Sequence, residues 1–379
     1  MLALLTKGEA HALVRLERDG LIGARTEPGE GPDRKVSRIT RRGIARPQAE
    51  GIRHLSVPAP GQRDRPGHVC AAAESHRTRA SAPGLYPQNV TNLALHLPSP
   101  LVPIRDDRMV SRGLRLYLKR DDLIHSELPG NKWRKLKHNI VAARERNATT
   151  MLTFGGAYSN HIRATAAAGH YFGFATIGVI RGEEHLPLND SLAYAESRGM
   201  KLVYMDRATY RAKHSPAVVA NLRERFGDFY LVPEGGSNVL ATVGCRELVA
   251  EIDVDFDLIC CPCGTGGTLA GVSMGLAGKQ RAMGFSALKG GAFLTDEVSA
   301  LQRRSLGAVL ENWTIECGFH FGGFARGAPE LDEFIKSFGN EHGVALERIY
   351  VAKMMFGIVA LAERGAFAPD TTIIALITG

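Results

Sequence analysis

Short apolar segments with the character of β-strands alternate with segments of helical periodicity from about residue 100 to residue 379. Parallel strands joined by helices bury both faces of a sheet, so this alternation predicts an α/β fold with open, mainly parallel sheets flanked by helices. The predicted strands are 114–119, 151–154, 174–180, 201–205, 229–232 and 258–263, and the predicted helices are 132–146, 162–171, 192–198, 215–226 and 268–276.

Glycine-rich turns follow three of the predicted strands and indicate where a ligand binds. They read GGAYSNH from Gly155, EGGSN from Glu234 and CGTGGT from Cys263. In open parallel sheets, ligands bind beyond the carboxyl ends of the strands. Turns of small residues there let backbone N–H groups and the following helix N-terminus surround an anion. Each turn alone also fits an ordinary cap or loop, and a loop is the default interpretation of EGGSN.

The turn from Cys263 has the composition of a site for a single phosphate group. Thr265 and Thr268 add hydroxyl donors to its glycines. No Gly-Lys-Ser or Gly-Lys-Thr ending follows, which argues against a nucleoside triphosphatase P-loop, and the match to the dinucleotide fingerprint is poor. Cys260, Cys261 and Cys263 lack the distant ligand pair of a zinc site, so we predict no metal and interpret them as buried strand residues.

Lys132 is the candidate nucleophile of the sequence. It stands in the run GNKWRKL from Gly130, just after a Gly-Asn turn and at the expected start of a helix. The positive end of the helix and the neighbouring cations Arg134 and Lys135 all favour a neutral amine, which formation of a Schiff base requires. The alternative is a solvated basic helix face, which is the commoner arrangement for such a run.

Composition excludes several other classes of protein. Hydrophobic residues make up 44% and charged residues 23% of the 379 residues, so global disorder and fibrous repeats are excluded. Six cysteines are too few for a disulfide scaffold and suit a reducing cytosol. The uncharged run between Asp257 and Lys279 is rich in glycine and contains Pro262, which favours a strand, a loop and a helix over a membrane span. We predict a cytoplasmic protein without membrane contact.

Residues 1–85 differ from the rest and carry most of the formal net charge of +8. The stretch RLERDGLIGARTEPGEGPDRKVSRIT resembles the last helix and the wing of PadR-type winged-helix regulators, with a short strand expected at 34–40. A winged helix reads DNA with a complete recognition helix, and the segment that would supply it is missing after Ala12. We therefore predict an incomplete winged-helix remnant over 1–45, a disordered linker over 46–85, and no nucleic-acid partner.

The order and spacing of the later motifs resemble the 1-aminocyclopropane-1-carboxylate deaminase and D-cysteine desulfhydrase family. The resemblance runs from about residue 90 to residue 379 and continues through GFSALKG, FHFGGF and YVAKMMFG. It implies two sheets of the tryptophan-synthase-β fold type, pyridoxal 5'-phosphate as cofactor, a small amino acid as substrate, and a homodimer. It also implies a large cofactor-binding domain, residues 86–135 and 229–379, with a small inserted domain, residues 136–228.

The same resemblance assigns roles to individual residues. Lys132 holds the cofactor through its amine, Asn160 hydrogen-bonds the ring oxygen, and Ser159 takes the substrate carboxylate. Tyr350 lies near the ring as an acid–base group, and Thr378 meets the pyridine nitrogen. A hydroxyl at that nitrogen leaves it unprotonated, which favours elimination over transamination. The phosphate is held by Gly264, Thr265, Gly266, Gly267 and Thr268.

Three positions depart from the family's pattern and bear on the reaction. Val351 stands where the deaminases have Glu and the desulfhydrases usually Thr, Ile377 replaces a frequent His, and Ala352 replaces a usual Gly. Valine can neither bond nor protonate the ring nitrogen, so we predict a D-cysteine desulfhydrase that releases pyruvate, ammonia and sulfide. The alternatives are 1-aminocyclopropane-1-carboxylate deaminase activity, a catalytically weakened cofactor-binding protein, and a DNA-binding regulator acting through residues 1–45.

Overall fold

The computed structural model describes residues 25–27, 36–38 and 93–379. In the first part, β1 (Arg25–Glu27) pairs antiparallel with β2 (Val36–Arg38), and β2 lies inside the strand expected at 34–40. The other N-terminal predictions, a winged-helix remnant and a disordered linker, lie outside the described residues. The chain divides into two compact units, Met1–Leu85 and Tyr86–Gly379.

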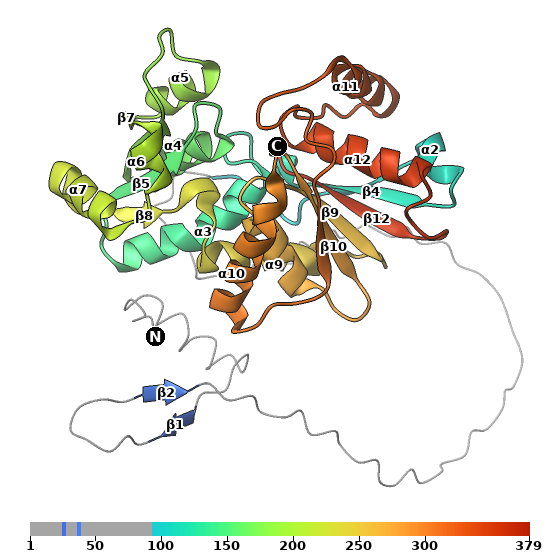
Figure 1. Ribbon diagram of the computed structural model, residues 1–379, viewed down its shortest axis with the longest axis horizontal. Coiled ribbons are helices and arrows are strands. Elements are labelled where there is room, and N and C mark those ends of the chain that lie inside the picture. Colours follow the sequence, from blue (N-terminus) through green and yellow to red (C-terminus); the bar gives the residue numbers. More distant parts are fainter. Residues whose placement is uncertain (1–24, 28–35, 39–92) are drawn as a thin grey trace, which may run out of the picture. The chain divides into compact units, whose positions relative to one another are not determined.

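The larger sheet of the second unit has six strands in the order β11-β10-β9-β12-β4-β3. All neighbouring strands are parallel except β3 and β4. Figure 1 shows β4 and β12 side by side although they come from opposite ends of this unit. The strands are β3 (Leu101–Ile104), β4 (Arg115–Arg120), β9 (Leu258–Cys263), β10 (Arg281–Ser286), β11 (Trp313–Glu316) and β12 (Thr372–Ile377).

A second, smaller sheet has four strands in the order β7-β6-β5-β8, and all of them are parallel. The prediction of two mainly parallel sheets flanked by helices is therefore confirmed. How residues 86–379 divide into a large and an inserted domain stays a prediction. The strands are β5 (Thr150–Gly155), β6 (Ala175–Arg181), β7 (Met200–Met205) and β8 (Tyr230–Val232).

Eleven α-helices and four short 3-10 helices connect these strands in the described part of the chain. The α-helices are α2 (Asp107–Val110), α3 (Gly130–Glu145), α4 (Asn160–Phe172), α5 (Asp190–Ser197), α6 (Arg207–Arg211), α7 (Pro216–Phe226), α8 (Val239–Arg246), α9 (Gly267–Gly275), α10 (Leu294–Leu306), α11 (Pro329–His342) and α12 (Val351–Glu363). The 3-10 helices are η1 (Asp121–Leu123), η2 (Glu234–Gly236), η3 (Glu247–Glu251) and η4 (Gly291–Phe293).

Strand β9 shows how the larger sheet buries both of its faces. Leu258 and Cys260 pack with α2, α11 and α12 on one face, whereas Ile259, Cys261 and Cys263 pack with α9 and α10 on the other. Neighbouring side chains of a strand point to opposite faces, so a continuous apolar run is what a doubly covered strand requires. The three cysteines are free and buried, as predicted.

The smaller sheet is covered on both faces as well. Met151 packs with α3 and α4, whereas its neighbour Leu152 packs with α6 and α7. Helix α3 thus lies against the small sheet, yet its first residue, Gly130, lies against Thr378, directly after β12 of the large one. The cofactor lysine that the sequence predicts therefore stands where the two sheets meet.

The structure tests two further predictions, that of no membrane-spanning segment and that of where the helix with Lys132 begins. The uncharged run between Asp257 and Lys279 forms β9, a tight turn and α9. Within residues 93–379 and the two N-terminal strands, no helix is long and apolar enough to cross a bilayer. Helix α3 begins at Gly130 instead of at Lys132, with Pro129 in extended conformation as the residue before it.

Candidate active site

Most of the predicted site residues follow the carboxyl ends of strands, whereas Lys132 and Tyr350 lie at the starts of α3 and α12. Two hydrogen bonds connect several of these segments. Asn160 at the start of α4 donates from Nδ2 to the backbone oxygen of Gly379 at 3.3 Å. Asn131 at the start of α3 donates from Nδ2 to Thr268 Oγ1 at 3.0 Å. The ends of β5, β9 and β12 and the start of α3 therefore meet at one place, as the glycine-rich turns predicted.

Because Gly130 has no side chain, the first residue of α3 can pack against the backbone of Thr378, directly after β12. Its φ is +56°, in the left-handed region that favours glycine. A Cβ added there would lie 2.0 Å from the backbone oxygen of Thr378, far inside van der Waals contact. Any larger residue would push the first turn of α3, and Lys132 with it, away from the strand end.

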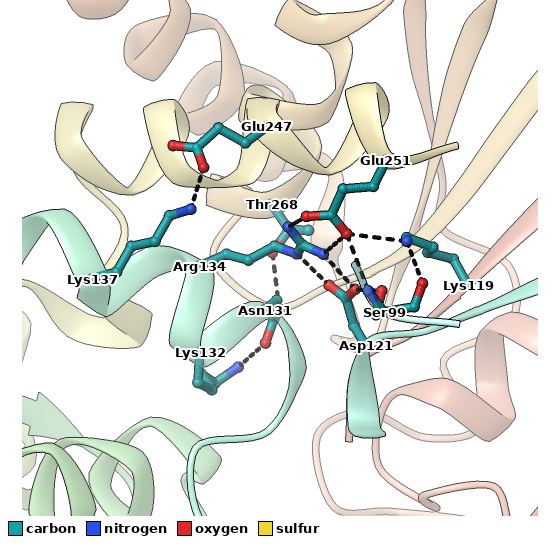
Figure 2. Close-up of polar contacts among 10 residues, drawn as sticks. All are labelled: Ser99, Lys119, Asp121, Asn131, Lys132, Arg134, Lys137, Glu247, Glu251 and Thr268. Atoms are coloured by element: carbon teal, nitrogen blue, oxygen red, sulfur yellow. Dashed lines mark hydrogen bonds and ion pairs between the residues drawn. The ribbon is translucent and has the colours of Figure 1, made fainter. Parts of the chain in front are cut away.

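Lys132 is held by the residue before it. Its Nζ donates to Asn131 Oδ1 at 2.9 Å, and the same amide reaches Thr268 through its nitrogen. Figure 2 shows this chain of contacts from Lys132 through Asn131 to Thr268. A single buried amide thus links the candidate nucleophile to the first turn of α9, which follows the glycine-rich turn.

The pKa of Lys132 is lowered to about 7, chiefly by burial of the amine and secondly by the charge of Lys135. The prediction of a neutral amine is supported, but one of its stated causes is wrong. Arg134 does not face Lys132, because its guanidinium binds Asp121 and Glu251 on the other side of the helix. Those carboxylates neutralise the charge that the sequence had placed beside the lysine.

The alternative of a solvated basic helix face is also wrong. Arg134, Lys135 and Lys137 are 1%, 3% and 8% exposed. Arg134 forms two bidentate pairs, with Nε and Nη2 on Asp121 at 2.6 and 2.8 Å and with Nη1 and Nη2 on Glu251 at 2.7 and 2.8 Å. Burying a charge is costly unless hydrogen bonds or an opposite charge compensate it, and here both carboxylates do so.

A polar cradle that the sequence analysis missed surrounds the turn after β9. Lys135 Nζ donates to the backbone oxygen of Gly235 at 3.0 Å and to Ser237 Oγ at 3.2 Å. Ser237 Oγ in turn lies 2.6 Å from Thr265 Oγ1. A cation, two hydroxyl groups and the N-terminus of α9 therefore stand together, which is the donor set that binds a phosphate. The EGGSN turn belongs to this cradle and is not an ordinary loop.

Ser159 caps α4 as the sequence predicted. Its Oγ accepts from the backbone N–H of Ile162 at 3.4 Å.

His161, two residues after Ser159, is fully buried. Burial is the main cause that lowers its pKa well below the usual value, and the charges of Lys132 and Lys135 lower it further. His161 is therefore neutral, with Nε2 2.8 Å from Thr153 Oγ1. Its Nδ1 is buried and has no hydrogen-bond partner among the residues that the structure describes.

Tyr350 stands at the start of α12 and faces the turn after β9. A Cβ added to Gly264 would lie 3.0 Å from the Tyr350 ring. Burial, followed by the carboxylates of Glu347 and Glu234, raises the pKa of the phenol, so Tyr350 keeps its proton at neutral pH. Phe324 packs edge-on against the same ring with centroids 5.8 Å apart. The phenol of Tyr350 is thus protonated and can donate a hydrogen bond.

The three positions that depart from the family's pattern all lie in the interior. Val351 and Ala352 are fully buried and Ile377 is 2% exposed, and all three belong to the apolar core on the α12 face of the large sheet. Thr378, directly after Ile377, is 3% exposed and lies against Gly130. The side chain of Val351 therefore contributes packing and no polar group.

Two cavities open beside the loop that carries Ser159. One of ≈ 400 Å³ is lined by residues that include Tyr158, Arg181 and Arg207, and one of ≈ 700 Å³ by residues that include Glu347 and Arg348. Tyr158, Phe324 and Ala325 line both. The wall shared by the cavities thus carries Phe324, whose ring touches Tyr350.

The arrangement fits an aldehyde that carries a phosphate group. Lys132 supplies a largely neutral amine near pH 7, and the cradle of Lys135, Ser237 and Thr265 supplies donors for the phosphate. At Gly267 an added Cβ would lie 2.4 Å from Ser237 Oγ and 3.3 Å from Lys135 Nζ, so only glycine keeps the cradle open. The lysine and the cradle are connected through Asn131 and Thr268.

Comparison with protein families gives one match that covers most of the chain. The profile described as pyridoxal-phosphate dependent enzyme matches residues 94–379. The match includes every site residue named above and none of the residues before 94.

The names of several relatives state an activity. A putative 1-aminocyclopropane-1-carboxylate deaminase of Pyrococcus furiosus is 32% identical over 271 residues, which is 67% of this chain and 81% of the relative. A bifunctional D-cysteine desulfhydrase/1-aminocyclopropane-1-carboxylate deaminase of Arabidopsis thaliana, described as mitochondrial, is 31% identical over 295 residues, which is 72% of this chain and 73% of the relative. A D-cysteine desulfhydrase of Salmonella typhi is 26% identical over 285 residues, 70% of this chain and 87% of the relative.

Solved structures agree with the fold. A 1-aminocyclopropane-1-carboxylate deaminase homologue superposes with a TM-score of 0.67 at 27% identity, covering 76% of this chain and 90% of its own. A hydrogen sulfide-producing enzyme from Fusobacterium nucleatum superposes with a TM-score of 0.54 at 13% identity, covering 74% and 94%. The second likeness concerns the fold alone.

Proposed function

The chain belongs to the family of pyridoxal-phosphate dependent enzymes, with pyridoxal phosphate as its cofactor, and we propose that it eliminates sulfide from D-cysteine. The net reaction converts D-cysteine and water into pyruvate, ammonia and hydrogen sulfide. It breaks the Cα–H and Cβ–S bonds, and water then replaces the nitrogen on Cα, so that ammonia leaves and the keto group forms. It consumes no oxidant or reductant.

The environment of Val351 is the observation that carries the choice of reaction. Ring opening of 1-aminocyclopropane-1-carboxylate is expected to use a polar side chain directly after the site tyrosine, and here that side chain is a valine in the apolar core. Elimination of sulfide needs a base for the Cα proton and an acid for the leaving sulfur. Lys132 and Tyr350 are suited to those two tasks.

Each of these residues would act in a protonation state that the structure supports. When bound, pyridoxal phosphate supplies the electron sink for the electrons that remain on Cα. Lys132 Nζ, with a pKa of about 7, would take the Cα proton. Tyr350, whose phenol is protonated, would give a proton to the departing sulfur. The N-terminus of α4 with Ser159 would hold the substrate carboxylate.

Remaining residues would hold the cofactor. The cradle of Lys135, Ser237 and Thr265, together with Gly264, Gly266, Gly267 and Thr268, would bind the phosphate. Asn160 would reach the ring oxygen. Thr378, which lies at the end of β12 beside Gly130, would meet the pyridine nitrogen.

A second candidate is 1-aminocyclopropane-1-carboxylate deamination. It is favoured by the Arabidopsis thaliana relative, whose name joins the two activities. The same site could then serve both substrates, with Lys132 and Tyr350 as the proton-transferring groups.

The experiment is a substrate panel with the full-length protein loaded with pyridoxal phosphate. We expect a visible absorption band from the bound cofactor, equimolar sulfide and pyruvate from D-cysteine, and far slower turnover of L-cysteine. Lys132→Ala should remove both the band and the activity. Lys201→Ala, at an exposed position, is the matched control and should retain both.

Three outcomes would contradict the proposal in different ways. A preference for 1-aminocyclopropane-1-carboxylate, detected as 2-oxobutyrate, would exchange the first candidate for the second. A bound cofactor without turnover of any of the three amino acids would mark a cofactor-binding protein that has lost catalysis. A protein that takes up no cofactor would contradict the assigned site as a whole.

A further inference from the structure

Lys353 is a buried lysine for which the proposed reaction has no use. It lies in the first turn of α12, three residues after Tyr350, and is 1% exposed. In the described part of the chain its amine forms no ion pair. Instead, Nζ donates to two backbone oxygens, that of His320 at 2.9 Å and that of Gly323 at 2.7 Å.

The two oxygens mark the beginnings of two consecutive tight turns. The N–H of Gly323 donates to the oxygen of His320 at 3.0 Å, and the N–H of Arg326 donates to the oxygen of Gly323 at 3.1 Å. Each oxygen therefore accepts once from its own turn and once from Lys353. One amine thus connects both turns of the loop 320–326 to the first turn of α12.

The loop 320–326 has a conformation that local preferences oppose. Phe321 and Ala325 have φ values of 49° and 55°, which non-glycine residues adopt rarely. Gly323 has a φ of 116°, which is accessible to glycine. Backbone of this kind persists where surrounding contacts impose it, and such sites are commonly functional. The amine of Lys353 is a contact that can impose it on both turns at once.

The same loop builds the wall next to the predicted acid. Phe324 packs edge-on against Tyr350, with ring centroids 5.8 Å apart. Phe324 and Ala325 also line both cavities beside the loop of Ser159. A displacement of the two turns would therefore move the support of the Tyr350 ring and the cavity wall together.

We propose that Lys353 is a positioning residue, whose amine holds the loop 320–326 so that Phe324 supports Tyr350 at the cavity wall. The assignment of Tyr350 to the reaction rests on the proposed function, whereas the tethering of the loop does not. A lysine suits the task because its ammonium group offers three donors to carbonyl oxygens and needs no carboxylate in return.

The attachment of the loop 320–326 by the Lys353 amine, called the tether below, is tested by limited trypsin digestion of the holoenzyme. The cleavage rate measures how often the loop opens locally. Arg326 is exposed and lies at the end of the second turn, so cleavage after it requires that the loop unfolds locally. We expect Lys353→Met to speed cleavage after Arg326 at least tenfold. Lys336→Met, an exposed lysine of α11, is the matched control and should behave like the wild type.

The consequence for catalysis is tested with the same variants. Lys353→Met should lower kcat for D-cysteine at least tenfold, change KM less than twofold, and leave the cofactor absorption band and the bound cofactor per chain unchanged. Phe324→Ala should lower kcat in the same way without faster cleavage after Arg326, because the amine still holds the turns. Comparing Lys353→Met with Phe324→Ala therefore distinguishes the loss of the hydrogen bonds that hold the loop from the loss of the Phe324 packing on Tyr350.

Several results would overturn the proposal. Cleavage after Arg326 in Lys353→Met at the rate of Lys336→Met would show that the amine does not hold the loop. Faster cleavage at all sites with loss of cofactor would show that Lys353 stabilises the whole unit and not the loop. Faster cleavage after Arg326 with an unchanged kcat would refute the link to Tyr350. An inactive wild type contradicts the proposed function instead, and the cleavage rates still decide the tether.

Discussion

The amine of Lys132 loses its proton at a pH far below that of an ordinary lysine. Burial and the charge of Lys135 lower its pKa from 10.5 to about 7. The neutral amine is the form that reacts with an aldehyde, and its fraction rises as the pH rises through the pKa. We predict that the rate at which cofactor-free protein captures pyridoxal phosphate rises with pH and reaches half of its plateau near pH 7. Growth of the visible absorption band after mixing measures this rate.

The variant Lys135→Met distinguishes the two causes of the lowered pKa of Lys132, which are burial and the charge of Lys135. Without the neighbouring charge the pKa of Lys132 should rise, so the midpoint of the pH profile should move upward even though weaker phosphate binding also lowers the plateau. Lys201→Met, which removes an exposed lysine, should leave the midpoint in place. A wild-type midpoint above about pH 9 would mean that Lys132 is an ordinary solvated amine.

Gly267 sets the space available to the phosphate. An added Cβ would lie 2.4 Å from Ser237 Oγ and 3.3 Å from Lys135 Nζ, so Gly267→Ala should push the two donors apart. We expect cofactor affinity to fall by about tenfold or more, which corresponds to ~1.4 kcal/mol. Equilibrium titration of cofactor-free protein measures it. Gly339→Ala in α11, where an added Cβ meets only an atom at 3.8 Å, should leave the affinity unchanged.

At the level of elements, a buried ionic network attaches α3 to the large sheet. Arg134 pairs with Asp121 of η1, directly after β4, and with Glu251 of η3, and Lys119 Nζ lies 3.1 Å from Glu251. Removing one partner of a buried pair leaves the others uncompensated, which typically costs ~3–5 kcal/mol. We predict a loss of that size in the free energy of unfolding for Arg134→Met, measured by denaturant titration.

Arg348 provides the matched control for that prediction. It binds Asp332 with the same two-point geometry, at 2.6 and 2.8 Å, but both side chains are about half exposed. Water already solvates such a pair, so Arg348→Met should cost less than ~1 kcal/mol. Equal losses in the two variants would show that burial is not what makes the Arg134 network strong.

The elements that the sequence predicted well are those determined by neighbouring residues. The sequence predicts strand β9 over its full length, 258–263, because a run of six apolar residues followed by a glycine-rich turn has one simple interpretation. Lys132 and Ser159 are candidate site residues for a similar reason, since a turn or cap motif adjoins each of them, and their roles stay predictions. Local patterns also predicted that the cysteines of β9 are buried.

The features that the sequence did not predict depend on pairs far apart in the chain. Ser237 and Lys135 are separated by 102 positions, and Arg134 and Glu251 by 117. No local pattern in a single sequence predicts which lysine side chain will contact which loop in the folded chain. The direction of Arg134 was therefore predicted wrongly, and Lys353 was not noticed, because its partners are backbone oxygens of a loop 30 positions away.

For the whole molecule, the described contacts among the proposed site residues lie within the unit Tyr86–Gly379. The family profile begins at residue 94, within that unit. We predict that a chain of residues 86–379 binds the cofactor and turns over D-cysteine at the rate of the full-length protein. Its unfolding midpoint, measured by thermal denaturation of both holoproteins, should agree within about 2 °C. The homodimer and the cytoplasmic location stay predictions.

A second truncation shows where the catalytic unit begins. Ser99 donates from Oγ to Asp121 at 2.6 Å, and its backbone oxygen accepts from the fully buried Lys119 at 2.6 Å. A chain of residues 101–379 loses both bonds, and a buried donor left unsatisfied costs ~1–3 kcal/mol. Leu93 and Leu95, which pack against the α3 core, are lost as well. We therefore expect residues 101–379 to unfold well below residues 86–379 and to hold the cofactor poorly, and equal stability of the two chains would refute the structural role of Ser99.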